Sequence, residues 1–311
     1  MPDKLLNLKI DIVFQELFGN PKNVEITSHL LSLILKRKIY NVDLDVNKRL
    51  YGNSDMSKIG RLDVRAKFND GEDCNIELQV AKYNNMDQRM LEYWAVMYQS
   101  KIQRGQSYSV LRPSICILIA DYELEQTKGI SNYHTTWNLR EAVHSNRKFS
   151  NDIELHILEI PKIKNNDIKN DELAHWLMFI DNPDSEEVSK FMEENKFFKQ
   201  AREELAYLSG DENFKFLVHD RAMFLMDQDA REKQGFADGL AMGKVEGRAE
   251  GRAEGRAEGR AEGRAEGKAE GIASGKKEKQ IEIAKKMKEK NIPNIQIEEL
   301  TGLSKEEIEK I

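Results

Sequence analysis

Three polar side chains, Asp63, Glu77 and Gln79, fall on what the sequence predicts to be one face of a β-hairpin. Apolar and polar residues alternate over 61–68, RLDVRAKF, and again over 74–80, CNIELQV, which is the period of half-buried strands. Two carboxylates beside an amide could hold a divalent cation that polarises a phosphodiester and activates water. The alternative is a solvated strand face whose charge is balanced by neighbouring arginines.

The register of this hairpin decides whether the two carboxylates meet. A three-residue loop over 69–71 would pair Asp63 with Glu77 across the strands. Such a loop favours glycine at its last, left-handed position, and Gly71 is there. A two-residue loop would instead pair Asp63 with Leu78, setting a charge beside an apolar side chain. Because facing like charges destabilise a sheet and a divalent cation removes that cost, the hairpin predicts a carboxylate pair suited to a metal.

The segments around the hairpin predict an α/β domain. Apolar spacing indicates, in chain order, two helices separated by Gly19-Asn20-Pro21, a strand over 38–50, the hairpin, a helix over 86–105 that ends at Gly105 as its C-cap, and buried strands over 113–122 and 154–160. From Asp171 to about Phe236 the patterns are helical. Helices and strands in this order predict a mixed sheet flanked by helices, followed by a helical region.

A four-residue repeat of Gly, Arg, Ala and Glu dominates 243–275. In a helix, each residue type drifts by about 40° per repeat, so no fixed face forms. Glycine costs about 1 kcal/mol relative to alanine at each site, and neighbours four residues apart carry like charges. We therefore expect a solvated spacer, helical in part, and not a folded core. After it, 276–311 regains helical periodicity, with Ser304 and Glu307 spaced as a capping box.

Composition narrows the class of protein further. Charged residues make up 33% of the 311 residues and apolar residues 40%. The formal net charge of -6, taken alone, argues against binding to nucleic acid, but the distribution of charge matters more than its total. Two cysteines, no leader and no long apolar run indicate a cytoplasmic protein without a membrane span. The histidines lack zinc spacing, and no phosphate-binding or dinucleotide motif is visible, so no organic cofactor is expected.

Asp63 followed by Glu77-x-Gln79 resembles the D…(D/E)-x-K core of the PD-(D/E)XK nuclease superfamily. Successive blocks are similar to its recombination-promoting nuclease (Rpn), or putative transposase, branch: DIVFQELFG at 11–19, RLDVRAKFNDGEDCNIELQV at 61–80, RMLEYWAVMYQSKIQRGQSY at 89–108 and PSICILI at 113–119. The match covers about the first 160 residues. The charged repeat and the TGLSKEEI segment also resemble endings seen in that family. The predicted parts are then a nuclease-like domain over 1–165, a helical region over 166–242, the spacer over 243–275 and a small helical unit over 276–311.

The resemblance implies a restriction-endonuclease-like fold and a DNA endonuclease that hydrolyses phosphodiester bonds with Mg²⁺, with Mn²⁺ or Ca²⁺ as substitutes. Asp63 and Glu77 would be the metal ligands. Gln79 would be the third catalytic residue, in the position that is usually lysine; a neutral amide cannot stabilise developing negative charge as an ammonium can, although glutamine is typical of this branch. The rival from another class is a catalytically inactive nuclease fold that binds DNA or acts as a scaffold.

Three accessory candidates complete the predicted site. Asp11 either approaches the site from the first helix or caps or pairs locally, and Gln15 stands where the family often has lysine. Gln88 and Arg89 open the helix after the hairpin, where they either contact backbone phosphate or form a solvated helix end. A homo-oligomer formed through the tail is a further hypothesis about partners.

Overall fold

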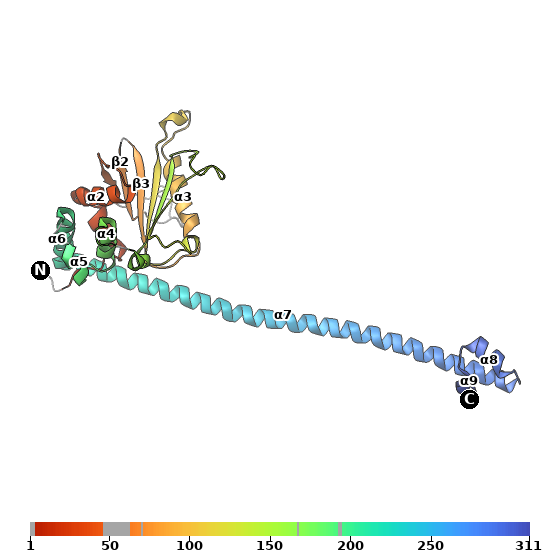
Figure 1. The fold of residues 1–311 in the computed structure, drawn as a ribbon. Coiled ribbons are helices and arrows are strands. Elements are labelled where there is room, and N and C mark those ends of the chain that lie inside the picture. Colours follow the sequence, from red (N-terminus) through yellow and green to blue (C-terminus); the bar gives the residue numbers. More distant parts are fainter. Residues whose placement is uncertain (1–3, 46–62, 70, 167, 192–194) are drawn as a thin grey trace. The chain divides into compact units, whose positions relative to one another are not determined.

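The computed structural model of the protein describes residues 4–45, 63–69, 71–166, 168–191 and 195–311 (Figure 1). Two compact units make up the chain, Met1–Asp227 and Gln228–Ile311. Part of the strand predicted over 38–50, together with Arg61 and Leu62 of the predicted hairpin, lies outside the described residues. Within the described part of the chain, no helix is both long enough and apolar enough to cross a membrane.

A mixed six-stranded sheet runs through the described part of the first unit, in the order β1-β2-β3-β4-β6-β5. Its strands are β1 (Asp43–Asp45), β2 (Val64–Phe68), β3 (Glu72–Gln79), β4 (Ser114–Ala120), β5 (His134–Trp137) and β6 (Ile153–Glu159). The neighbours β3, β4 and β6 are parallel, whereas the pairs β1–β2, β2–β3 and β5–β6 are antiparallel. The buried strands predicted over 113–122 and 154–160 are confirmed as β4 and β6, and the short edge strand β5 was not predicted.

Helices pack on both faces of the sheet, which confirms the predicted fold class (Figure 1). They are α1 (Asp11–Gly19), α2 (Val24–Leu35), α3 (Met86–Gln99), α4 (Glu172–Asp181), α5 (Glu186–Phe191) and α6 (Lys196–Gly210), with 3-10 turns η1 (Pro21–Asn23), η2 (Tyr108–Val110), η3 (Glu125–Thr127) and η4 (Ile160–Asn165). One core joins α1, α2, α4, α5 and α6 to the β3 side chains Cys74, Ile76 and Leu78. A second core joins α3 to the opposite face of β4, through Cys116 and Leu118.

The β2–β3 hairpin has the predicted register. Phe68 pairs with Glu72, so three residues form the loop, and Gly71 has φ 112°, the left-handed backbone that favours glycine. Apart from the exposed Lys67, the polar face of the hairpin is largely buried, and Arg65 and Asp73 form an ion pair on it, with Nε and Oδ1 2.9 Å apart. The alternative of a solvated strand face is therefore wrong.

The helix predicted over 86–105 is shorter than expected, because α3 ends at Gln99. Lys101 takes the next position on its inward face, and the ammonium donates to the carbonyls of Arg112 and Pro113 at 3.0 and 2.8 Å. A charged side chain at this position cannot pack in the apolar core, so the amphipathic helix ends before it. Gly105 is not the C-cap; it has φ 88° within the following turn.

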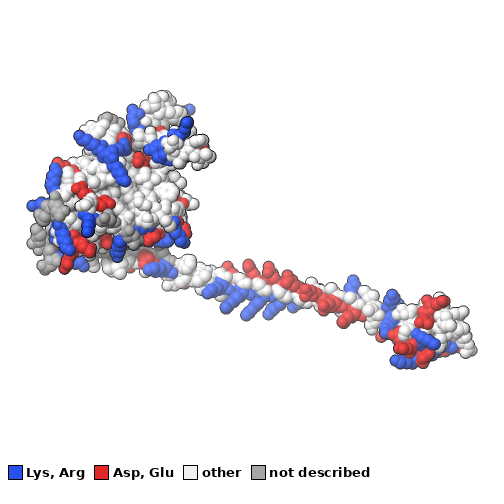
Figure 2. All heavy atoms as spheres, viewed as in Figure 1, with Lys and Arg blue, Asp and Glu red and all other residues white. Residues whose placement is uncertain are grey.

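The repeat continues a single long helix, α7 (Glu212–Glu289), so it is helical throughout and not only in part. Three of every four repeat positions are Ala, Arg or Glu, which rank among the strongest helix formers. Side chains over 243–274 are exposed, and Figure 2 shows the basic and acidic ones as separate stripes along this helix. Beyond it, α8 (Asn294–Thr301) and α9 (Lys305–Glu309) fold back on a small core that includes Ala284. The capping box of Ser304 and Glu307 is confirmed.

Candidate active site

The two predicted metal ligands lie side by side at the end of the hairpin. Asp63 immediately precedes β2 and is 7% exposed, and Glu77 is in β3 and 3% exposed. The Asp63 carboxylate accepts a hydrogen bond from the backbone N–H of Leu78 at 2.8 Å, which fixes Asp63 across from Glu77. Besides burial, the charge of Asp63 raises the pKa of Glu77, as expected for neighbouring carboxyl groups. The Glu77 side chain lies on the face of the sheet that turns toward α3, because its neighbour on β4 is Leu118 of the second core.

Burial and mutual repulsion both favour a proton on this pair. Burial raises the pKa of Asp63 to about 6, and the nearby charge of Asp11 adds to the rise, against the hydrogen bonds that Asp63 accepts. Burial also raises the pKa of Glu77 well above its ordinary value, followed by the charge of Asp63. Without a cation, the pair therefore holds a proton near neutral pH.

Three amide side chains donate long hydrogen bonds to the pair. Gln79 and Asn75 donate to the two Glu77 oxygens at 3.3 and 3.4 Å, and Gln15 of α1 donates to Asp63 at 3.4 Å. Asn75 was missed by the sequence reasoning, although its position two residues before Glu77 on β3 would have placed it on the same face. Its Oδ1 is buried and accepts no hydrogen bond from the described residues.

Asp11 approaches the site and is also paired. It opens α1, its charge reaches Asp63, and its carboxylate accepts hydrogen bonds from Arg221 Nε at 2.9 and 3.0 Å. The partner is not local, because Arg221 belongs to α7, 210 residues away. No signal in the sequence links these two residues.

Of the two remaining candidates, Arg89 lies near the carboxylate pair and Gln88 does not. The charge of Arg89 lowers the pKa of Glu77, and the Arg89 guanidinium donates to the Tyr93 hydroxyl at 2.7 Å. It also lies 5.1 Å from the centre of the Tyr83 ring. Gln88, by contrast, is exposed on α3, and no hydrogen bond joins its side chain to another described residue. Only Arg89 therefore has contacts expected of a site residue.

Gln79→Ala is expected to lower nuclease activity by about 10- to 100-fold, the usual cost of removing a group that orients a ligand. The physical reason is that Gln79 donates to Glu77, so its loss frees one carboxylate oxygen to rotate. Initial rates on plasmid DNA measure the effect. Gln88→Ala is the matched control and should keep the wild-type rate; equal losses in the two variants would contradict the assignment.

The donor set fits an open magnesium site better than a closed zinc site. No group of three or more His, Cys, Asp or Glu side chains suited to a metal occurs among the described residues. Mg²⁺ is commonly held by one or two carboxylates, with water and phosphate oxygens completing its shell, whereas structural zinc needs four protein ligands. The buried pair and the unpartnered Asn75 oxygen beside it match the first pattern.

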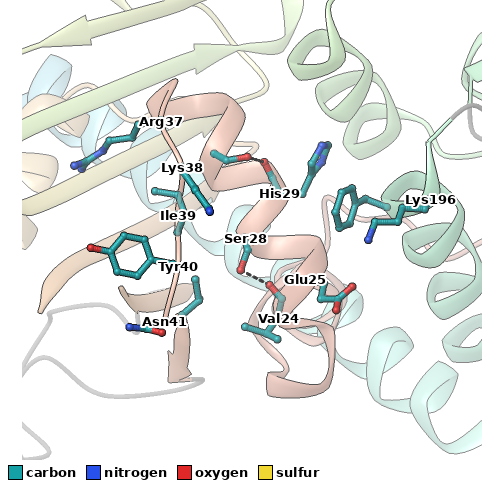
Figure 3. Close-up of a pocket in the computed structure, with 13 residues that line it drawn as sticks. Val24, Glu25, Ser28, His29, Arg37, Lys38, Ile39, Tyr40, Asn41 and Lys196 are labelled. Carbon is teal, nitrogen blue, oxygen red and sulfur yellow. Dashed lines mark hydrogen bonds between the residues drawn. The ribbon is translucent and has the colours of Figure 1, made fainter. Parts of the chain in front are cut away.

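A pocket of about 760 Å³ lies apart from the carboxylates, between α2, residues 37–42 and the start of α6 (Figure 3). None of the predicted site residues lines it. The hydroxyl of Ser28 already donates to the Val24 carbonyl at 2.6 Å, so this part of its wall is internally satisfied. The pocket therefore does not compete with the carboxylate pair as the reaction centre.

Comparison with known proteins confirms the resemblance to the PD-(D/E)XK nucleases. The family model of the PD-(D/E)XK nuclease family transposase matches residues 8–234, which include both carboxylates, Asp11 and Arg221. No curated protein and no solved structure gives a significant match. Because the family model covers most of the sequence, the chain belongs to the PD-(D/E)XK nuclease family transposases.

Proposed function

We propose that the protein is a DNA endonuclease that hydrolyses phosphodiester bonds with Mg²⁺, for which Mn²⁺ or Ca²⁺ can substitute. The observation that carries the proposal is the buried pair of Asp63 and Glu77, which repel each other unless a proton or a cation lies between them. Membership of a nuclease family supports the same class of reaction. Self-association through the tail stays a prediction.

In this proposal, Asp63 and Glu77 hold the ion through their carboxylate oxygens. When bound, the ion would polarise the scissile phosphate and lower the pKa of water. The N–H of Leu78 holds the Asp63 carboxylate by a hydrogen bond, and the Gln79 amide does the same for Glu77. The carbonyl oxygen of the Gln79 amide can orient the attacking water. Because Gln79 is neutral, it cannot offset the negative charge that develops on the phosphate.

Two guanidinium groups supply positive charge that Gln79 lacks. Arg89 acts on Glu77 from α3, and Arg221 acts on Asp63 from α7. Guanidinium groups bind phosphate oxygens strongly, which suits Arg89 to a DNA backbone. Arg221 already donates through Nε and Nη2 to Asp11. We therefore assign Arg89 to substrate binding and both arginines to charge balance.

Cleavage of supercoiled plasmid tests the proposed function. The full-length protein with Mg²⁺ or Mn²⁺ should give nicked or linear DNA, and EDTA should leave the plasmid intact. Cleavage that persists in EDTA would contradict a metal-dependent reaction. Intact plasmid with every cation, from a folded protein that still shifts DNA on a gel, would support the catalytically inactive DNA-binding protein instead.

A further inference from the structure

Three segments meet at one end of the sheet, the end where β3, β4 and β6 begin. They are 36–41 after α2, 100–112 before β4 and 138–150 before β6, and together we call them the sheet end. The parallel register brings Asp73 of β3, Ser114 of β4 and Ile153 of β6 level with one another. Figure 1 shows the second and third segments rising from the upper end of the sheet.

Direct contacts tie the segments into one surface. The N–H of Tyr40 donates to the Asn69 side chain at 3.0 Å, which joins the first segment to the hairpin loop. A Cβ on Gly71 of that loop would lie 3.4 Å from the side chain of Arg112, in the second segment. The N–H of Ser114, just after the second segment, donates to the carbonyl of Asp152 at 3.0 Å, just after the third.

The sheet end is strongly basic, although the chain as a whole has a formal net charge of -6. Its three segments hold nine Lys and Arg side chains and one carboxylate, Glu141, which accepts a hydrogen bond from the N–H of Val143. Beside them, Glu72 at the start of β3 pairs with Arg37. Seven of the basic side chains are exposed and form no ion pair with any described residue: Lys36, Lys38, Arg104, Arg112, Arg140, Arg147 and Lys148. Figure 2 shows Lys and Arg gathered on this upper part of the unit. Unpaired cations at this density attract a polyanion.

Large apolar side chains stand among these cations. Tyr108 is 80% exposed in the second segment, and Phe149 is 83% exposed in the third. Val143, at the tip of the third segment, is 82% exposed. Exposed aromatic rings on segments that also carry unpaired cations are typical of surfaces that stack unpaired bases, which a duplex keeps inside its own stack.

We propose that the sheet end binds single-stranded nucleic acid, with phosphates on the unpaired Arg and Lys side chains and bases stacked on Tyr108 and Phe149. The proposal rests on the proposed function for the choice of nucleic acid as substrate, and adds a contact surface separate from the reaction centre. Glu77 is five residues along β3 from Glu72 at the sheet end, so about 17 Å separates this surface from the carboxylates. A strand bound there would extend beyond the bond that is cut.

Binding of labelled oligothymidylate to the full-length protein in EDTA tests this proposal without any chemistry at the carboxylates. Fluorescence anisotropy should show that Arg104→Glu/Arg147→Glu binds at least about tenfold more weakly and with a smaller dependence on salt. Tyr108→Ala/Phe149→Ala should bind at least about tenfold more weakly, because it removes both rings on which bases would stack. The matched charge control, Lys190→Glu/Arg202→Glu on α5 and α6, should change the affinity by less than about threefold.

A duplex of equal length should bind the wild-type protein and the aromatic variant alike. The proposal is overturned if the aromatic variant binds oligothymidylate as the wild type does, or if the control loses as much affinity as the sheet-end charge variant. Circular dichroism of each variant confirms folding. Plasmid cleavage with Mg²⁺ is measured in parallel, so that cleavage without sheet-end binding rejects this inference alone, and binding without cleavage rejects only the proposed reaction.

Discussion

Asp63→Asn is expected to abolish cleavage, by about 10³-fold or more, while the protein stays folded and becomes more stable. The amide keeps the size of the side chain and an oxygen that can accept from the N–H of Leu78, but it removes one of the two charges that would hold the metal. It also removes the repulsion between two buried carboxyl groups. That repulsion destabilises the wild-type fold, so the variant should be more stable. Glu77→Gln should behave in the same way.

Plasmid cleavage rates and urea unfolding measure the two effects on the same preparations. The matched control is Glu92→Gln, because Glu92 is an exposed acid on α3 and should change neither quantity. A variant that loses activity together with stability would show a structural role for the carboxylate. A variant that keeps activity would remove Asp63 from the reaction.

Without a divalent cation, the free energy of unfolding should fall as the pH rises from about 4 through about 6. The folded-state pKa of Asp63 is raised from 3.8 to about 6, and that of Glu77 is raised well above its ordinary value. Between the unfolded and folded pKa values the folded protein binds more protons, so raising the pH favours unfolding. For Asp63 alone the loss is about 3 kcal/mol. Mg²⁺ between the carboxylates should restore most of it.

Urea unfolding at several pH values, in EDTA and in Mg²⁺, measures this linkage. In EDTA the wild-type midpoint should fall across the range, and in Mg²⁺ it should stay nearly level. The double variant Asp63→Asn/Glu77→Gln should show neither this part of the pH dependence nor the response to Mg²⁺. A wild-type protein that responds to Mg²⁺ no more than the double variant does would contradict a metal site at this pair.

The hairpin could be predicted because its information is local. Strand alternation and the glycine of the loop lie within 20 residues, and together they predict the observed register, in which Val64 pairs with Ile76. The central strands β4 and β6 were predicted for a similar reason, since continuous apolar runs are typical of strands buried on both faces.

The parts that failed depend on tertiary contacts. The partnership of Asp11 with Arg221 joins α1 to α7 through the fold, and no periodicity within either helix encodes it. The end of α3 depends on where Lys101 finds carbonyl acceptors, which are in a different segment. Helix formation through the repeat was misjudged because the costs of glycine and like charge were weighed above the propensities of the other positions.

The pairing of Asp63 with Glu77 depends on the length of the loop between β2 and β3, which is three residues. Side chains of a strand alternate between faces, so one residue added to or removed from the loop would shift the pairing of β3 by one position. Asp63 would then lie opposite Leu78 after a deletion or Ile76 after an insertion, and no longer opposite Glu77. A substitution in this loop that keeps Gly71 leaves the register unchanged, whereas an insertion or deletion of a single residue would separate the two carboxylates.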